Sequence, residues 1–471
     1  MIQVAVVGAG ITGLAAALRL LQRAPDAEVT LFEKAERLGG KIRTERADGF
    51  VIEAGADSFL TRKARGVALC GELGLAGRLV ARQAAHAGTF VRYGGALHPL
   101  PEGFTGMIPT RIDTLTESAL LSAEGRAALA GEGSVPAPTD RREESIAEFV
   151  IRRFGREVYE RIVEPLMAGI YGGDGEQLSL DATFPQLRDL ERRYGSLIRG
   201  LTASREKDVI DATPPFISLA GGMGELIEHL EARLRDASIQ TSVEVVALEP
   251  RKGGGFVLGL RDGASAEADA VILATPAPST ARVTRAFDRE LSDLHAAIAY
   301  GSSVTVNLAF RERDLSRPIA GYGFVVPRVE DSDVVGVTVA SNKWPGRATQ
   351  GYALFRVYLR AHRGSDLTCE TDDALIRAAR RELNETYGVA AGPMFVRADR
   401  WPTAIPQYTL GHGGRVSHIR ERLAAHRGLF VAGAAYSGVG IPDCIASGEA
   451  AADDALIHVA AADREAPSAS V

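Results

Sequence analysis

The sequence predicts an α/β protein of more than one domain, in which a helix-covered parallel sheet is combined with a mixed α+β region. The first observation is the length, because 471 residues exceed what one hydrophobic core usually organises. The second is a β-branched apolar run over residues 2–7 that passes through three glycines into an Ala- and Leu-rich helical stretch. The third is a further strand, glycine loop and helix pattern from residue 428 onwards.

Composition and charge narrow the class of protein. Hydrophobic residues make up 46% and charged residues 24% of the chain, as in ordinary globular proteins. A net charge of −6 argues against nucleic-acid binding, which requires a basic face. Cys70, Cys369 and Cys444 have neither C-x-x-C nor Cys/His spacing, so we expect no disulfides, no metal site and a cytoplasmic location. No uncharged stretch is long enough for a membrane span, so any membrane contact is expected at the surface.

The N-terminal motif is Gly8-Ala9-Gly10-Ile11-Thr12-Gly13, between a predicted strand and a predicted helix. In that context the motif indicates dinucleotide binding by a Rossmann-like domain. Gly8 allows a tight turn, Gly10 lets the backbone approach a diphosphate, and Gly13 lets the helix lie close to its strand. The helix N-terminus would then direct free amides at the phosphates. Taken alone, the same glycines would equally suit an ordinary strand-to-helix turn. The predicted contacts are Gly8, Ala9, Gly10, Ile11, Thr12 and Gly13.

The second predicted strand, residues 27–32, ends at Glu33. A carboxylate at this spacing accepts hydrogen bonds from a ribose 2′-hydroxyl. The glycine pair Gly39-Gly40 permits a close backbone approach to a ligand, and nearby cations, Arg37, Lys41 and Arg43, suit a diphosphate. The predicted contacts of this segment are Glu33, Lys34, Gly40, Lys41 and Ile42.

The middle of the chain is predicted to interrupt the nucleotide-binding domain. Residues 103–217 have mainly helical patterns, and Ser145 with Glu148 forms a capping-box signature. Alternating apolar residues from Ser302 onwards predict a sheet with one covered face. The expected helices are 111–130, 145–154, 156–168 and 374–387, and the expected strands are 302–310, 321–327 and 353–359.

Two later segments are predicted to return to the dinucleotide. A strand over 238–248, hairpins at Gly253-Gly254-Gly255 and Asp262-Gly263, and a strand over 268–276 rebuild the nucleotide-binding domain. Near the C-terminus, a strand, a glycine loop and a helix N-terminus form a second corner that suits an anion or a carbonyl. The predicted contacts of these segments are Val245, Ala274, Trp401, Gly433, Val439, Gly440 and Ile441.

Five further motifs carry a family resemblance. They are Gly55-Ala56-Asp57-Ser58-Phe59-Leu60-Thr61-Arg62-Lys63, His98-Pro99-Leu100-Pro101-Glu102-Gly103 with Ile108-Pro109-Thr110, Gly169-Ile170-Tyr171-Gly172-Gly173-Asp174, Ile405-Pro406-Gln407-Tyr408 and Gly438-Val439-Gly440-Ile441. Together they closely resemble the oxygen-dependent protoporphyrinogen oxidase family, including its coproporphyrinogen III oxidase branch, over nearly the whole chain. Two departures are Ala56, where the family often has proline, and Thr89, where plant and mitochondrial members have an arginine for a propionate.

The resemblance implies a three-part flavoprotein with FAD as cofactor and an amine oxidase/porphyrinogen oxidase-like fold. The expected parts are an FAD-binding domain (1–57, 218–276 and 400–460), a substrate domain (58–102 and 277–399), a helical subdomain (103–217) and a flexible tail (461–471). The helical subdomain is expected at the inner face of the cell membrane, and a homodimer is expected. The loop implied to run along the flavin is Gly55, Ala56, Asp57 and Ser58.

The implied reaction is the oxidation of a porphyrinogen to the porphyrin by O2 in haem biosynthesis, with coproporphyrinogen III preferred. The alternatives are protoporphyrinogen IX as the main substrate, an amine or polyene oxidase, or an escort protein that has lost the flavin. No catalytic acid or base is predicted, because the flavin is the hydride acceptor. The predicted substrate contacts are Arg62, Lys63, Ile170 and Tyr171. Arg62 and Lys63 would bind propionates, or would form a solvated basic turn.

Overall fold

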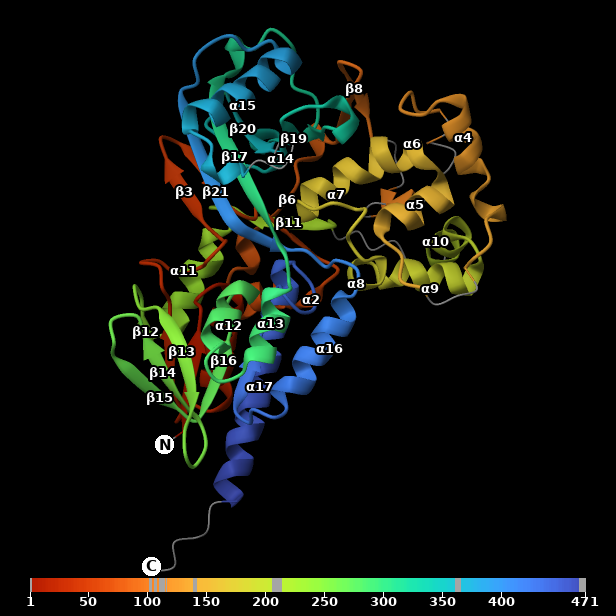
Figure 1. Cartoon of the computed structure of the whole chain (residues 1–471). Helices are drawn as coiled ribbons and strands as arrows, with labels where there is room; N and C mark the ends of the chain where they lie inside the picture. The colour runs from red at the N-terminus through yellow and green to blue at the C-terminus, as the bar shows by residue number, and fades with distance from the viewer. Residues whose placement is uncertain are drawn as a thin grey trace, which may run out of the picture.

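The computed structural model describes residues 2–100, 104–105, 108–109, 115, 117–138, 142–205, 214–360 and 366–465. In Figure 1 a parallel sheet with its helices occupies the lower part of the molecule. A second, larger sheet lies above it, and a group of helices projects to one side. The predicted α/β class is confirmed, whereas the domain boundaries stay a prediction.

The parallel sheet has the strand order β12-β2-β1-β16-β22. All of its pairings are parallel. Its strands come from segments far apart in the sequence, so the sheet forms only when these segments meet. They are β1 (Gln3–Val7), β2 (Glu28–Phe32), β12 (Ser238–Gln240), β16 (Ala270–Leu273) and β22 (Leu429–Val431).

Both faces of this sheet are buried, as expected for parallel strands. Val4 and Val6 of β1 face a core shared with four helices, whereas Ala5 and Val7 face a core on the opposite side. The first core is formed with α1 (Ile11–Arg23), α2 (Ala64–Glu72), α11 (Gly224–Arg233) and α17 (Ile441–Glu465). The second is formed with β13 (Val245–Pro250), β14 (Phe256–Leu260), β15 (Ser265–Ala268), α12 (Ala277–Thr284), α13 (Arg289–Ala296) and α16 (His412–Leu423).

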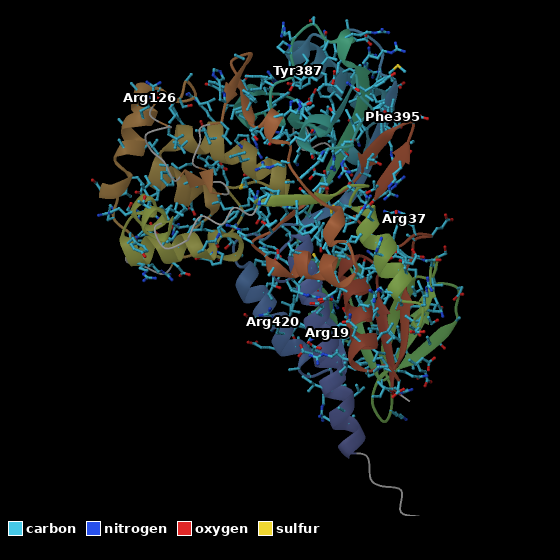
Figure 2. The ribbon with its side chains drawn as sticks, turned by 180° about the vertical axis from the view of Figure 1, so that it is seen from behind. Arg19, Arg37, Arg126, Tyr387, Phe395 and Arg420 are labelled. Carbon is cyan, nitrogen blue, oxygen red and sulfur yellow. The ribbon has the colours of Figure 1, made fainter. Side chains whose placement is uncertain are left out.

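Polar contacts hold two of these helices together at their surface. Arg19 of α1, which is labelled in Figure 2, donates to both carboxylate oxygens of Asp453 on α17, at 2.9 and 2.8 Å. This bidentate pair joins the two ends of the chain, since the two residues are 434 positions apart.

The second sheet has seven strands in the order β21-β17-β20-β19-β18-β7-β8. On one face of β17, Val304, Val306 and Leu308 pack in a core that includes residues of α15 (Asp372–Tyr387). The intervening Thr305 and Asn307 are also buried, so both faces are covered at this strand. The strands are β7 (Phe90–Tyr93), β8 (Ala96–Pro99), β17 (Tyr300–Arg311), β18 (Gly323–Val325), β19 (Val334–Val339), β20 (Tyr352–Leu359) and β21 (Phe395–Pro406).

The projecting helices have a core of their own, and the predicted capping box is present. The Ser145 hydroxyl accepts from the Glu148 amide at 3.1 Å, and the Glu148 carboxylate accepts from the Ser145 amide at 2.9 Å. The helices are α4 (Ala123–Ala130), α5 (Ile146–Phe154), α6 (Arg156–Val158), a π-helical turn (Tyr159–Val163), α7 (Glu164–Tyr171), α8 (Leu180–Thr183), α9 (Pro185–Tyr194) and α10 (Leu197–Arg205).

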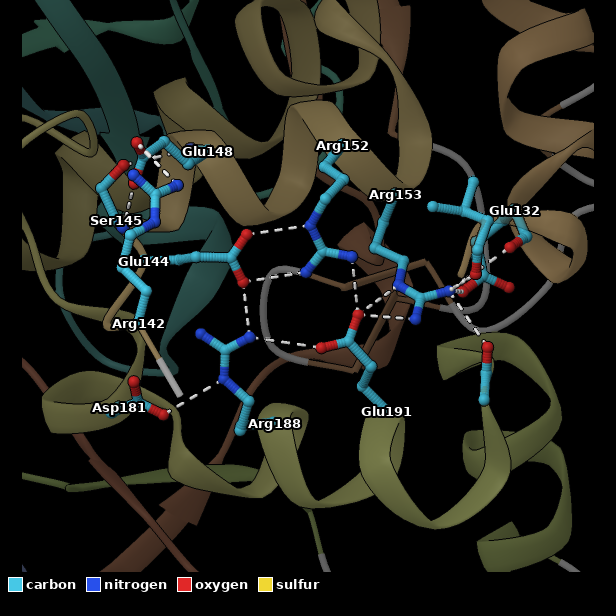
Figure 3. Close-up of polar contacts among 12 residues, drawn as sticks. Glu132, Arg142, Glu144, Ser145, Glu148, Arg152, Arg153, Asp181, Arg188 and Glu191 are labelled. Carbon is cyan, nitrogen blue, oxygen red and sulfur yellow. Dashed lines mark hydrogen bonds and ion pairs between the residues drawn. The ribbon is translucent and has the colours of Figure 1, made fainter. Parts of the chain in front are cut away.

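A buried ionic network fixes α5 against α9 (Figure 3). Arg152 and Arg153 of α5 both donate to the Glu191 carboxylate of α9, at 2.8 and 2.6 Å. Glu144 accepts from Arg152 and from Arg188. Because each buried charge has an opposite partner, the network holds the helices in one arrangement.

Shorter elements join the two sheets. β5 (Phe59–Leu60), β11 (Phe216–Leu219) and β6 (Leu79–Ala81) form a three-stranded sheet. The remaining elements are β3 (Thr44–Ala47), β4 (Phe50–Glu53), β9 (Phe104–Thr105), β10 (Ile108–Pro109), α14 (Ala340–Lys343) and six single-turn 3-10 helices.

One sequence-based boundary was wrong. The strand expected over 238–248 is two strands in different sheets, because Ser242 adopts a left-handed backbone conformation with φ 59°. In the range of the helix expected over 111–130, residues 123–130 form α4, whereas residues 111–114 and 116 lie outside the described part. In the range of the tail expected over 461–471, α17 continues to Glu465, and residues 466–471 lie outside the described part.

Candidate functional site

A cavity of about 1650 Å³ is lined by residues of both large sheets and of α7. Ordinary small-molecule sites have volumes of roughly 300–1,000 Å³. The cavity therefore has room for a dinucleotide and a second ligand. We call the part near the glycine motif the dinucleotide end and the part near β18, β19 and α7 the substrate end.

The glycine motif forms a cradle at the dinucleotide end. Gly8 has φ 101°, which suits glycine. A Cβ on Gly13 would lie 1.9 Å from the Gly8 carbonyl oxygen, so α1 lies close to its strand only because position 13 is glycine. A Cβ on Gly10 would meet nothing within 4 Å, and Gly10, Ile11 and Thr12 line the cavity. No side chain caps α1, so its first amides suit a diphosphate.

Glu33 lines the cavity next to this cradle. Its carboxylate accepts hydrogen bonds from the Ala9 amide at 2.8 Å and from the Ala35 amide at 2.9 Å. A carboxylate offers about four acceptor sites, so two remain for ribose hydroxyls. Ala9 does not line the cavity, so its amide orients Glu33 from behind.

The loop that follows β2 packs on the glycine motif. The Gly39 amide donates to the Ala9 carbonyl at 2.8 Å, and a Cβ on Gly40 would lie 3.2 Å from the Gly10 Cα. Lys34, Gly40, Lys41 and Ile42 all line the cavity.

Of the three cations expected for a diphosphate, Lys41 is the best placed. It lines the cavity, and its ammonium lies 5.4 Å from the centre of the Tyr300 ring. Burial lowers the pKa of this ammonium to about 8. The Arg37 guanidinium donates to loop carbonyls, at 2.6 Å in the case of Gly40. Arg43 does not line the cavity and lies 3.9 Å from Asp399.

The loop predicted to run along the flavin also lines the cavity, at Gly55, Ala56, Asp57 and Ser58. Asp57 accepts from the Lys343 ammonium at 2.7 Å and from the Trp344 indole at 3.1 Å. Burial alone would raise the pKa of Asp57, but Lys343, Arg356 and these hydrogen bonds lower it below its usual range. Asp57 is therefore a poor proton acceptor, and its ion pair holds the loop against α14.

The later predicted contacts also reach the cavity, with one exception. Val245, Ala274, Trp401, Gly433, Val439 and Ile441 line it. The Gly440 amide donates instead to the Asp443 carboxylate at 3.2 Å. Gly440 therefore caps α17 rather than lining the cavity.

The predicted substrate contacts divide into three groups. Tyr171 lines the cavity, and Ile170 lies in α7, although its side chain is outside the part that the structure describes. Arg62 and Lys63 do not line the cavity. The Lys63 ammonium pairs with Asp443 at 2.5 Å. Neither cation is thus placed to meet a ligand in this cavity.

Other cations line the substrate end, and local sequence patterns did not single them out. They come from a strand, a helix, a 3-10 turn and the loops after two strands, which converge only in the folded chain, so spacing carried no signal for them. Two carboxylates, Asp57 and Asp174, lie among them. The cations are Arg82, Arg328, Lys343, Arg356 and Arg360.

The described lining residues include no histidine. Tyr436, the aromatic residue considered for an amine-oxidase cage, does not line the cavity either. Its hydroxyl lies 3.1 Å from His295 Nε2 in a separate buried contact. An aromatic cage built on Tyr436 is therefore absent from the described part of the site.

Comparisons with known proteins agree with this geometry. The family model "Flavin containing amine oxidoreductase" matches residues 11–456. The coproporphyrinogen III oxidase of Bacillus subtilis (strain 168) is 34% identical over 468 residues, which cover 97% of this chain and 98% of that protein. The human protoporphyrinogen oxidase is 32% identical over 481 residues, covering 96% and 98%.

Solved structures show the same fold. A crystal structure from Exiguobacterium sp. 255-15, provisionally named a protoporphyrinogen oxidase, has a TM-score of 0.86 and 33% identity, and the match covers 98% of this chain and 99% of that one. The cyclohexylamine oxidase of Brevibacterium oxydans IH-35A has a TM-score of 0.69 and 16% identity, over 98% and 99% of the two chains.

Proposed function

The chain belongs to the family of flavin-containing amine oxidoreductases, and from that premise we propose that it oxidises a porphyrinogen to the porphyrin in haem biosynthesis. FAD is the cofactor, and the preferred substrate is coproporphyrinogen III, with O2 as the electron acceptor. The named relatives support this choice, since they include coproporphyrinogen III oxidases and a protoporphyrinogen oxidase that match nearly the whole chain.

The observation that carries the substrate choice is the charge of the substrate end. Five cations and two carboxylates line it, and Glu164 lies beside Arg328 and Arg360, which leaves an excess of two positive charges. A coproporphyrinogen has four propionates, whereas a protoporphyrinogen has two. Charge-assisted hydrogen bonds to carboxylates are among the strongest in proteins, so the more anionic substrate gains more from this lining.

The residues of this chain act mainly by position. FAD, when bound, supplies the acceptor for the hydride that leaves the porphyrinogen. The Asp57–Lys343 pair holds the loop of residues 55–58 in place. Apolar lining side chains, among them Leu166, Val335, Val337 and Ile405, exclude water from the substrate end and orient the macrocycle. Because the described lining has no histidine and Asp57 stays ionised, no acid or base is assigned.

Anaerobic reduction of the bound flavin tests this proposal. Coproporphyrinogen III and protoporphyrinogen IX are mixed with the holoenzyme side by side, and loss of the flavin absorbance is followed with time. We expect faster reduction by coproporphyrinogen III and a porphyrin spectrum as the product. Faster reduction by protoporphyrinogen IX would favour that alternative. Reduction by neither, with reduction by an amine, would overturn the porphyrinogen assignment.

For the location, we propose that the projecting helices rest on the cytoplasmic surface of the membrane. The support is that these helices stand out to one side of the molecule (Figure 1) and that the proposed substrate is amphiphilic. In the described residues, no helix has the length and apolar character of a membrane span. Flotation with liposomes, with and without anionic lipid, tests the proposal; no flotation in either case contradicts it. Light scattering on the same sample measures the expected homodimer.

A further inference from the structure

We propose that Arg82 is the residue that anchors a carboxylate of the substrate at the wall of the cavity. The inference rests on the proposed function, since it assigns a role within the substrate end. Arg82 follows β6, whose last residue, Ala81, pairs with Ile217 of β11. This places Arg82 between the small central sheet and β18, where it lines the cavity.

Two aromatic rings hold the Arg82 guanidinium. Its central carbon lies 5.1 Å from the centre of the Tyr322 ring and 5.5 Å from that of Phe216. The Tyr322 hydroxyl donates to the Gln83 carbonyl at 2.8 Å, which fixes that ring. Stacking on aromatic faces orients a guanidinium without using its N–H donors. The donors of Arg82 therefore stay available for a planar carboxylate.

The other cations of the substrate end have polar partners already. Lys343 pairs with Asp57 at 2.7 Å. Arg328 lies 3.4 Å from both Asp174 and Glu164. Each of these charges is partly balanced within the protein, so an added carboxylate must compete with a resident one.

Arg360 and Arg356 are held as well. Arg360 donates to the Val326 carbonyl at 3.0 Å and lies 3.9 Å from Glu164. Arg356 is buried, and it donates to the Ala54 carbonyl at 3.2 Å. Neither Arg356 nor Arg82 has an ion pair in the described ranges, but Arg82, unlike Arg356, also donates no side-chain hydrogen bond to a described residue. It is thus the cation at which a substrate carboxylate gains most.

The aromatic neighbours suit a flat ligand. Phe216 is 36% exposed, and both Phe216 and Tyr322 line the cavity. A macrocycle seated beside them would cover apolar surface while one of its carboxylates reaches Arg82. The site therefore combines an apolar wall with a cation whose side chain has no ion pair or hydrogen bond in the described residues.

The test compares one ligand with and without its charges. Coproporphyrin III and its tetramethyl ester are titrated, in the same detergent, into the oxidised holoenzyme and into Arg82→Ala, Arg82→Lys and Arg62→Ala. Arg62 is the matched control, because it is an exposed arginine of the same region that does not line the cavity. Bound FAD is quantified first, so that only folded holoenzyme is compared.

We expect Arg82→Ala to weaken binding of the acid by about 10- to 100-fold and that of the ester by less than about twofold. Arg82→Lys should recover part of the loss, because lysine keeps the charge but not the planar fork. In turnover, KM for coproporphyrinogen III should rise in Arg82→Ala with little change in kcat. Arg62→Ala should behave as the unsubstituted protein.

Three outcomes overturn the anchor. Equal losses for acid and ester would mean that Arg82 acts through packing, and an unchanged affinity for the acid would remove it from the site. An equal loss in Arg62→Ala would point to long-range charge alone. If the unsubstituted enzyme oxidises the porphyrinogen in any of these cases, the proposed function stands without the anchor. If it neither binds nor oxidises these tetrapyrroles, both proposals fail.

Discussion

The two ends of the cavity are lined by different kinds of chemical groups. The dinucleotide end is lined largely by glycines, backbone amides and the Glu33 carboxylate, all within residues 8–42. The substrate end is made of charged side chains from segments far apart in the chain. Asp57 and Lys343, for example, are 286 positions apart. The dinucleotide end therefore depends on local geometry, and the substrate end depends on long-range assembly.

The largest loss of stability and of bound flavin is expected at Gly13, where the neighbouring backbone leaves no room for a side chain. Gly13→Ala places a Cβ 1.9 Å from a backbone oxygen, and overpacking of this kind costs typically about 1–3 kcal/mol of stability, occasionally more. We expect a lower Tm and little bound flavin, measured by thermal unfolding and by absorbance.

Gly10→Ala is the matched control. Gly10 has φ −71°, and its added Cβ would meet no protein atom within 4 Å. The apoprotein should keep its Tm while FAD binding weakens, because the methyl group enters the cavity. A Tm loss as large as that of Gly13→Ala would contradict the assignment of different roles to the two glycines.

The second largest loss of FAD affinity is expected when the Glu33 carboxylate of the dinucleotide end is removed. Glu33→Ala removes the acceptors for ribose hydroxyls and also frees the Ala9 and Ala35 amides. Since a hydrogen bond to a charged group contributes about 1.5–3 kcal/mol, FAD binding should weaken by roughly 10- to 100-fold. Flavin retention after dialysis measures this loss of affinity. Glu36→Ala, at an exposed position three residues away, is the control. Retention equal to the unsubstituted protein would remove Glu33 from the site.

A smaller and pH-dependent effect is expected at Lys41. A bound diphosphate favours the charged ammonium, so FAD binding should raise the pKa of Lys41 above its ligand-free value of about 8. FAD affinity is therefore greatest below pH 8 and falls as pH rises through that value, by at most about tenfold per pH unit.

Titration of the apoprotein with FAD from about pH 7 to about pH 9.5, a range of about 2.5 pH units that includes the Lys41 pKa, checks this. Lys41→Met should bind FAD more weakly, and its affinity should no longer depend on pH. Lys41→Arg should keep the affinity for FAD at all of these pH values, because arginine stays charged. A pH dependence that persists in Lys41→Met would assign the titration to another group.

The smallest effect is expected at Lys63, on the outside of the cavity. Its ion pair with Asp443 is 42% exposed on the lysine side, and such surface pairs contribute about 0–1 kcal/mol. Lys63→Ala should leave the ratio of kcat/KM values for coproporphyrinogen III and protoporphyrinogen IX nearly unchanged. A tenfold change in that ratio would indicate that Lys63 contacts the substrate, and it would count against Arg82 as the anchor.

Much of the local structure could be predicted from the sequence, because it depends on contacts between residues that are close in the chain. The strand, glycine motif and helix of residues 3–23, the capping box of Ser145 and Glu148, and the hairpin at Asp262-Gly263 each depend on neighbours a few positions away. The backbone conformation that such residues permit is then enough to predict the turn or the helix end.

The substrate end could only be decided by the tertiary structure. Two adjacent cations, Arg62 and Lys63, attracted attention because they are neighbours in sequence, yet β5 and α2 place them outside the cavity. Arg82 lines it because β6 pairs with β11 and brings Phe216 beside it. The sequence by itself determined the class of fold and the dinucleotide end, where backbone geometry is set by local residue choice. The side chains that line the substrate end are decided by how distant segments pair and pack. The spacing of residues in the sequence does not reveal that long-range pairing.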